Sequence, residues 1–264
     1  MKLSNTFATL VATVHFREVL GQGHSSPFPN EGLQSGTPLR NRDIQNLTFY
    51  STTFYPQAPV VRFESTMIIP ASSPDPIQNG HVQAVWPGVN NKTLLQNVMT
   101  NTGGVGEWFT FPFFCCTTSG HLANQSQVYP GDSLTTTYLW DQAHNKWLDS
   151  WVSSPGDAGV QAGSTGFIGG ITFDPNIAPG HDVAMDTASL NIELQDGSTW
   201  DFGPIIWQNI LVVAQTTDDS WCTKPSVTDN MNFQMSVPTS NTANGTTTCY
   251  IASMVFTSPT KFGN

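Results

Sequence analysis

The strongest constraint on this chain is a succession of short, strand-like runs that are separated by turn sequences. β-Branched and aromatic residues dominate the runs, and Gly, Pro, Asn and Asp dominate stretches between them such as YPGD and SSPGDAG. No helical periodicity extends beyond about two turns. We predict an all-β, single-domain antiparallel β-sandwich of the jelly-roll kind. Its strands are expected in VVRFESTMII, HVQAVWPGV, TLLQNVM, EWFTFPFF, SLTTTYLWD, KWLDSWV, TGFIGGITF, SLNIEL, IIWQNILVVA and CYIASMVF.

The composition agrees with this fold and excludes one class of partner. Only 11% of the residues are charged, against roughly a quarter in an average domain, and uncharged polar residues take their place. Antiparallel sheets use such residues on the faces that alternate with apolar ones. The formal net charge is −10 with nine Lys and Arg residues, so nucleic acid is not an expected partner.

The N-terminus predicts export. A lysine, an apolar run from Phe7 to Val14 and small residues after it resemble a secretory signal peptide, placed at residues 1–20. An amphipathic arm is the alternative. Four N-x-[ST] triplets also fit a secreted glycoprotein. They begin at Asn46, Asn91, Asn124 and Asn244. No other stretch is long and apolar enough to cross a membrane.

The remaining boundaries follow from composition. Residues 21–57 are rich in Pro, Gly, Ser, Asn and Gln with little periodicity, which indicates an N-terminal arm, a linker or a propeptide. The sandwich is expected over residues 58–258, and residues 259–264 form a tail. The sequence does not specify an oligomeric state.

The four cysteines predict disulfides in an exported chain, and three pairings are possible. Adjacent cysteines rarely bond each other, so Cys115 and Cys116 are expected on opposite faces of a strand. A bond between Cys222 and Cys249 would close a C-terminal loop. Buried free thiols are the alternative.

Glu193, in SLNIEL, is the first candidate for chemistry. Alternation places Leu190, Ile192 and Leu194 on the core face, and Glu193 on the opposite face with polar neighbours. A solvated strand face explains such a glutamate equally well. Strand centres disfavour carboxylates, however, and a carboxyl walled by aromatic rings can act as an acid.

The order of several segments resembles the glutamic endopeptidases of fungi, the eqolisins. These segments are FESTMIIPAS, HVQAVWPGVN, KTLLQNVMTN, GEWFTFPFF, VYPGDSLTTTY and SLNIELQDGSTWDFGPIIWQNI. The resemblance implies a concanavalin-like or eqolisin-like jelly roll. It also implies a catalytic pair, with Glu193 as general acid and base on a water and Gln96 holding that water and the oxyanion. A satisfied polar strand residue is the alternative for Gln96.

Some segments depart from the eqolisin pattern. YSTTFYPQAP stands where active members carry an NWAG-like stretch, and VWPGVNN replaces a WVGIDG-like strand end, with Pro87 present and no aspartate. These departures leave the fold intact and put peptide binding and proteolysis in question.

Aromatic residues suggest a different substrate. Rings on a cleft face would favour a flat hydrophobic ligand, although core packing explains most of them. The candidates for substrate binding are Trp86, Trp108, Phe111, Trp140 and Trp207.

Size, the secretory start and aromatic content also resemble the small secreted fungal hetero-Diels–Alderases of tropolone–sesquiterpenoid biosynthesis. This resemblance implies acid-assisted dehydration to a tropolone quinone methide, which then adds to a humulene-type alkene. An acid glutamic endopeptidase and a non-catalytic carbohydrate-binding sandwich are the two alternatives. The histidines show no metal-ligand spacing, and nucleotide-binding motifs are absent, so neither a metal nor a cofactor is expected.

Overall fold

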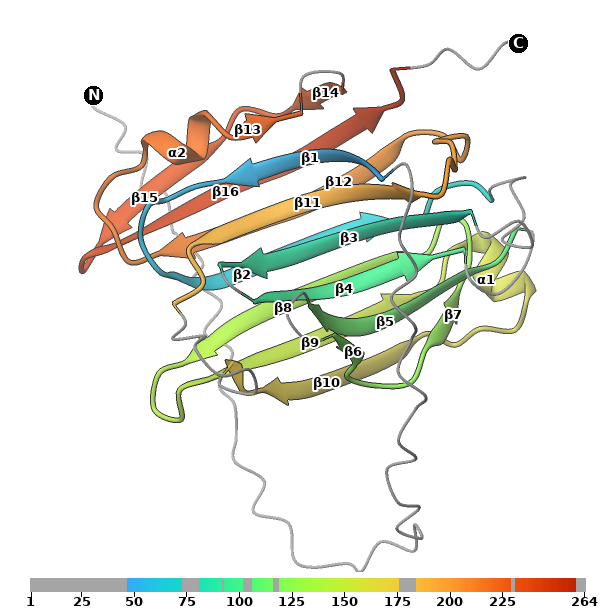
Figure 1. Cartoon of the computed structure of the whole chain (residues 1–264), viewed down its shortest axis with the longest axis horizontal. Coiled ribbons are helices and arrows are strands. Elements are labelled where there is room, and N and C mark those ends of the chain that lie inside the picture. Colours follow the sequence, from blue (N-terminus) through green and yellow to red (C-terminus); the bar gives the residue numbers. More distant parts are fainter. Residues whose placement is uncertain are drawn as a thin grey trace, which may run out of the picture. The chain divides into compact units, whose positions relative to one another are not determined.

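Two antiparallel sheets face each other and make a β-sandwich (Figure 1). The computed structural model describes residues 47–72, 81–91, 93–101, 106–115, 119–175, 184–228 and 231–259. Each sheet has eight strands in this part of the chain. The predicted fold class, an all-β antiparallel sandwich, is confirmed.

The first sheet, called sheet A, runs in the order β13-β1-β11-β3-β4-β5-β6, and β7 pairs with β5. Neighbouring strands are antiparallel throughout. Its strands are β1 (Thr48–Phe54), β3 (Val82–Asn90), β4 (Leu94–Thr100), β5 (Trp108–Cys115), β6 (Gly120–His121), β7 (Ser126–Val128), β11 (Thr187–Gln195) and β13 (Ser226–Val227).

The second sheet, sheet B, runs in the order β10-β9-β8-β2-β12-β16-β14, and β15 pairs with β16. Its strands are β2 (Val60–Ile68), β8 (Ser133–Asp141), β9 (Lys146–Ser154), β10 (Phe167–Phe173), β12 (Ile205–Ala214), β14 (Asn232–Met235), β15 (Thr239–Ala243) and β16 (Thr246–Thr257). Two short helices, α1 (Asp157–Gln161) and α2 (Ser220–Thr223), lie in connections between strands.

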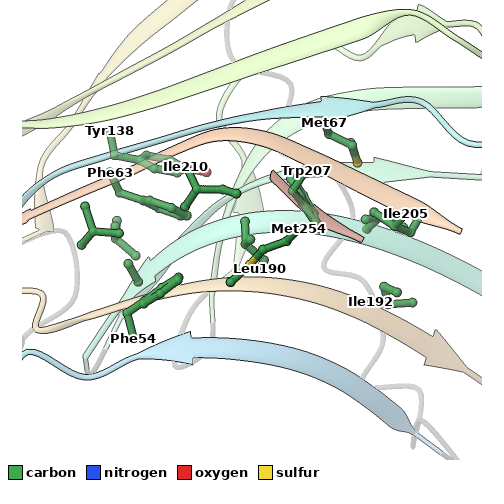
Figure 2. Packing of buried hydrophobic residues seen from close by; sticks show 14 of the residues in the cluster. Phe54, Phe63, Met67, Tyr138, Leu190, Ile192, Ile205, Trp207, Ile210 and Met254 are labelled. Atoms are coloured by element: carbon green, nitrogen blue, oxygen red, sulfur yellow. The ribbon is translucent and has the colours of Figure 1, made fainter. Parts of the chain in front are cut away.

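Side-chain alternation along the strands builds the core between the sheets. Figure 2 shows Phe54 and Leu190 of sheet A meeting Phe63, Trp207 and Met254 of sheet B. All five side chains are buried. The predicted inward face of β11 is also confirmed, because Leu190, Ile192 and Leu194 belong to this core. The strand face turned away from sheet B is called the outer face of sheet A below.

All ten predicted runs contain strands, but the sandwich begins earlier than predicted. The segment predicted as an arm, residues 21–57, includes β1, which pairs with β11 inside sheet A. The strand TFYSTTF was not predicted because it is short and lies among Pro- and Ser-rich residues. The predicted signal peptide, residues 1–20, and residues 260–264 of the predicted tail lie outside the described residues.

A disulfide joins Cys222 in α2 to Cys249 in β16, 27 positions later in the sequence, and this bond confirms the predicted C-terminal loop closure. Cys115 is also disulfide-bonded, and no described cysteine is free. Cys116 lies outside the described residues, so the predicted arrangement of the adjacent pair does too.

Three of the four predicted glycosylation asparagines lie on exposed positions: Asn91, Asn124 and Asn244. Asn46 falls outside the described residues. Asn244 and Gly245 have positive φ angles of 52° and 77° and turn the chain between β15 and β16. No helix in the described ranges has the length and apolar character needed to cross a membrane.

Candidate functional site

Glu193 lies on the outer face of sheet A, as alternation along β11 predicts. The Trp86 indole Nε1 donates a hydrogen bond of 3.1 Å to Glu193 Oε2, and the Gln195 amide Nε2 donates one of 2.7 Å to Oε1. Both oxygens of the carboxylate are therefore held by neutral donors. Glu193 itself is partly exposed, so a molecule on this face can reach the carboxylate.

The described strands around Glu193 carry no other charged side chain. Glu193 is the only Asp, Glu, Lys or Arg residue in the described strands of sheet A. Phe49 lies directly across from it on β1, and the Phe49 ring meets the Trp86 ring edge-on at a centroid distance of 6.5 Å. The carboxylate therefore stands alone among aromatic and amide groups.

A second apolar cluster lies on the same face, separate from the core between the sheets. We call it the outer-face cluster. Its buried members are Ala84, Trp86, Val98 and Phe111, and Val82, Leu94 and Phe113 pack against them. Since these residues alternate with core residues along β3, β4 and β5, they occupy the side away from sheet B.

Aromatic rings extend the outer-face cluster towards β6. The Phe111 ring lies 4.1 Å, centroid to centroid, from the His121 imidazole and 6.1 Å from the Phe113 ring. Partial burial lowers the pKa of His121, which favours the neutral imidazole at this end of the face.

Gln96, the other predicted catalytic residue, also lies on the outer face but far from Glu193. Gln96 on β4 pairs with Gly88 on β3, and Gly88 pairs in turn with Ser189 on β11. Ser189 and Glu193 are four residues apart on one strand, which corresponds to about 13 Å. The structure does not bring the amide of Gln96 and the carboxylate of Glu193 together.

The Trp86 ring occupies the space between the two predicted catalytic residues. Its Nε1 end touches Glu193, and its Cζ3 atom lies 3.2 Å from where a Cβ on Gly88 would stand. Gln96 Oε1 is buried without a hydrogen-bond partner. A water held jointly by Gln96 and Glu193, as the eqolisin resemblance implies, is not compatible with this arrangement.

Sequence reasoning missed Ser189, the β11 residue that lies in register with Gln96. Ser189 is buried, and its hydroxyl accepts a 2.8 Å hydrogen bond from Asn191 Nδ2. The period of two that placed Glu193 outward also places Ser189 outward, so the face was predictable. The pairing of β11 with β3 was needed to show which outward residue stands opposite Gln96.

Three of the five predicted substrate-binding aromatic residues belong to the core instead. Trp108 and Trp207 are core members, and Trp140 packs against the core beside Trp147. They point inward because their positions alternate with the outer-face residues of their strands. Trp86 and Phe111 are the two that lie on the face of Glu193.

A buried carboxyl that the sequence analysis did not single out lies between the sheets. Asp149 on β9 is only 1% exposed, and its Oδ1 accepts a 2.7 Å hydrogen bond from Asn97 Nδ2 on β4. Its Oδ2 has no partner. Burial raises the pKa of Asp149 to about 7, and the hydrogen bond from Asn97 opposes that rise. Alternation along KWLDSWV puts this aspartate on the same strand face as Trp147 and Trp151.

No group of three or more His, Cys, Asp and Glu side chains in the described residues could hold a metal ion. The geometry offers instead one accessible carboxylate beside an indole N–H and an amide. Such a group can accept and return a proton on a bound molecule.

Comparison with known proteins finds a likeness among solved structures only. No family model matches the sequence, and no curated protein matches it. Among solved structures, the chain is similar to scytalido-glutamic peptidase in a crystal structure with a transition state analog inhibitor. The identity is 10%, the TM-score is 0.47, and the match covers 77% of this chain and 98% of that chain. The likeness concerns the fold, and no residue role is transferred by it.

Proposed function

We propose that this protein is a secreted enzyme that binds a flat hydrophobic small molecule on the outer face of sheet A and transfers a proton on it through Glu193. The observation that carries the proposal is the isolation of this carboxylate. It is the only charged strand residue described in sheet A, and it is held between Trp86 and Gln195.

The reaction proposed is that of a hetero-Diels–Alderase acting on a hydroxymethyl tropolone. The Glu193 carboxylate takes the acidic ring hydroxyl proton and returns it to the departing hydroxyl as the C–O bond breaks. One water leaves, a quinone methide forms, and the carboxylate is restored. The quinone methide then forms one C–C and one C–O bond to a humulene-type alkene, with no redox change.

The aromatic neighbours supply the binding surface for the two partners. Phe49 is 40% exposed beside Trp86, and Phe113 is partly exposed at the other end of the outer-face cluster. Apolar rings around one carboxylate suit a conjugated ring system and an alkene better than an extended peptide. Holding two reactants together removes much of the entropic barrier to a bimolecular addition.

The separation of Gln96 from Glu193 argues against the alternative of an acid endopeptidase. A carbohydrate-binding sandwich needs an exposed aromatic platform and does not need Glu193. The exposed rings on the described surface are Phe49, Tyr55, Phe233 and Tyr250. The endopeptidase is the alternative that the test below detects.

The test compares wild type with Glu193→Gln on a hydroxymethyl tropolone and humulene. The matched control is Glu64→Gln on sheet B, because Glu64 is also a partly exposed strand glutamate held by hydrogen bonds from Arg62 and Thr137. We expect wild type and the control to form the cycloadduct, and Glu193→Gln to lose roughly 10²- to 10⁴-fold in rate.

Equal rates in all three proteins would remove the catalytic role of Glu193. A wild type that forms no cycloadduct above the uncatalysed rate would contradict the proposed reaction. Cleavage of a denatured protein at acid pH by wild type, absent in Glu193→Gln, would show an endopeptidase instead.

A further inference from the structure

The pairing between β3 and β4 is interrupted in the middle of sheet A. Cα pairs are present at Val85–Met99 and resume at Gly88–Gln96, and Pro87 lies in the gap opposite Asn97. A proline nitrogen has no hydrogen and cannot donate to the ladder, so prolines are rare in central strands. We call this gap the β3–β4 seam.

A tyrosine from the opposite sheet fills the seam. The Tyr138 hydroxyl on β8 donates a 2.9 Å hydrogen bond to the Pro87 carbonyl oxygen. Asn97, which stands opposite Pro87 on β4, lies near the same hydroxyl. The hydroxyl thus supplies the Pro87 carbonyl with a partner at the point where the pairing with β4 is interrupted.

Asp149 contacts β4 at Asn97, the residue opposite Pro87. Its carboxyl accepts a hydrogen bond from the Asn97 side chain, so Asn97 is bound to sheet B by its amide through Asp149. The second carboxyl oxygen, Oδ2, is buried without a partner. An ionised carboxylate in this position needs hydration that a closed interface does not provide.

We propose that Asp149 is a proton-operated latch on the β3–β4 seam: with its proton the seam is closed, and without it β4 loosens locally from β3 and from sheet B. The change reaches the outer face because the neighbours of Asn97 along β4, Gln96 and Val98, point to that face. The proposal does not depend on the reaction proposed above.

The groups that face Asp149 support this behaviour. They are Asn97 from β4, Tyr138 from β8, and Ile171 from β10, which lies next to it in register. Of these three neighbouring side chains, only the Tyr138 phenol can lose a proton. Burial first, and the nearby Asp149 second, raise the pKa of Tyr138 well above its usual value, so the phenol remains a donor at ordinary pH. Among Asp149 and these neighbours, Asp149 is therefore the side chain that changes its charge near neutral pH, because burial raises its pKa to about 7.

The experiment is amide hydrogen exchange by NMR at pH 5 and pH 8, corrected for the intrinsic exchange rate at each pH. The amides of Gln96, Asn97 and Val98 report on the seam, and the amide of Ile251 in β16 serves as an internal control. We expect protection at the seam to fall at least tenfold more from pH 5 to pH 8 than protection at Ile251, which follows the change in global stability. In Asp149→Asn the fall at the seam should disappear.

Unchanged protection at the seam, or an equal fall at Ile251, would overturn the proposal. An equal fall at the seam in Asp149→Asn would overturn it as well. If that variant does not fold, the carboxyl carbon of Asp149 is titrated in wild type by ¹³C NMR. Its midpoint must coincide with the midpoint of the shift changes at the Asn97 and Val98 amides, and different midpoints would refute the latch.

Discussion

The Tyr138 hydroxyl reaches from sheet B to the Pro87 carbonyl oxygen in sheet A over 2.9 Å. This contact joins the two layers of the sandwich at the point where β3 cannot pair fully with β4. Tyr138 is fully buried, and its ring stacks on Phe63 of the same sheet at a centroid distance of 6.0 Å. A buried polar contact of this kind stabilises the fold mainly by leaving no backbone group unpaired.

Tyr138→Phe should therefore destabilise the protein strongly. It removes only a hydroxyl, but it leaves the Pro87 carbonyl oxygen without this partner. We expect a loss of roughly 1 to 3 kcal/mol in the free energy of unfolding, measured by denaturant titration. Tyr129→Phe is the matched control, since the Tyr129 hydroxyl donates to Gln127 in a partly exposed place. A Tyr138→Phe loss no larger than that of the control would show that the hydroxyl does not support the seam.

Stability should fall as the pH rises from about 4 to about 7. The folded protein keeps the Asp149 proton up to about pH 7, whereas the unfolded chain loses it near 3.8. The folded state therefore binds more protons in this range, and the contribution of Asp149 is present below pH 4 and lost by pH 7. At about 1.4 kcal/mol for each pH step, the loss is about 4 kcal/mol.

The difference between wild type and Asp149→Asn isolates this effect from other titrating groups. We expect the free energy of unfolding to fall less in Asp149→Asn than in wild type as the pH rises across this range. Parallel pH profiles for the two proteins would contradict the expectation.

Gly169→Ala in β10 should destabilise the protein, while Gly170→Ala should be tolerated. A Cβ at Gly169 would meet atoms of the Trp151 ring, whereas the nearest atom to a Cβ at Gly170 is the Asp149 carbonyl oxygen at 3.5 Å. Displacing a packed indole should cost roughly 1 to 3 kcal/mol. Thermal unfolding of both variants measures the contrast. Equal melting temperatures would show that Trp151 moves aside freely.

Removal of the disulfide in a Cys222→Ala and Cys249→Ala double variant should cost about 3 to 4 kcal/mol. The bond closes a loop between positions 27 apart, and the released chain gains the corresponding entropy when it unfolds. Denaturant titration against wild type measures this cost. A loss below about 1 kcal/mol would mean that the unfolded chain remains restricted without the bond.

The sequence predicted the architecture well because period-two alternation is a local property. SLNIEL alone placed Leu190 in the core and Glu193 on the outer face, and the structure agrees. The early strand β1 was missed because its few residues lie in Pro- and Ser-rich surroundings, and its pairing with β11 supplies what local propensity does not.

The site was less predictable because it depends on the register between strands. Alternation places both Gln96 and Glu193 on one face, but only the pairing of β4, β3 and β11 shows that Ser189 stands in line with Gln96. The order of sequence motifs likewise cannot reveal that the Trp86 ring separates the two residues. For Trp108 and Trp207, alternation did not decide the face, because Trp108 alternates with three phenylalanines in WFTFPFFC and a register shift interrupts β12 after Gln208.

Pro87 also limits the ways in which sheet A can assemble. Since Glu193 is the only charged residue in its described strands, this sheet could slide by two residues and keep its apolar side inward, because such a shift preserves the alternation. With β3, every such offset would bury a proline beside a backbone group that Tyr138 no longer reaches. Pro87 therefore favours the native register of β3, because only in that register does the Tyr138 hydroxyl bind the Pro87 carbonyl.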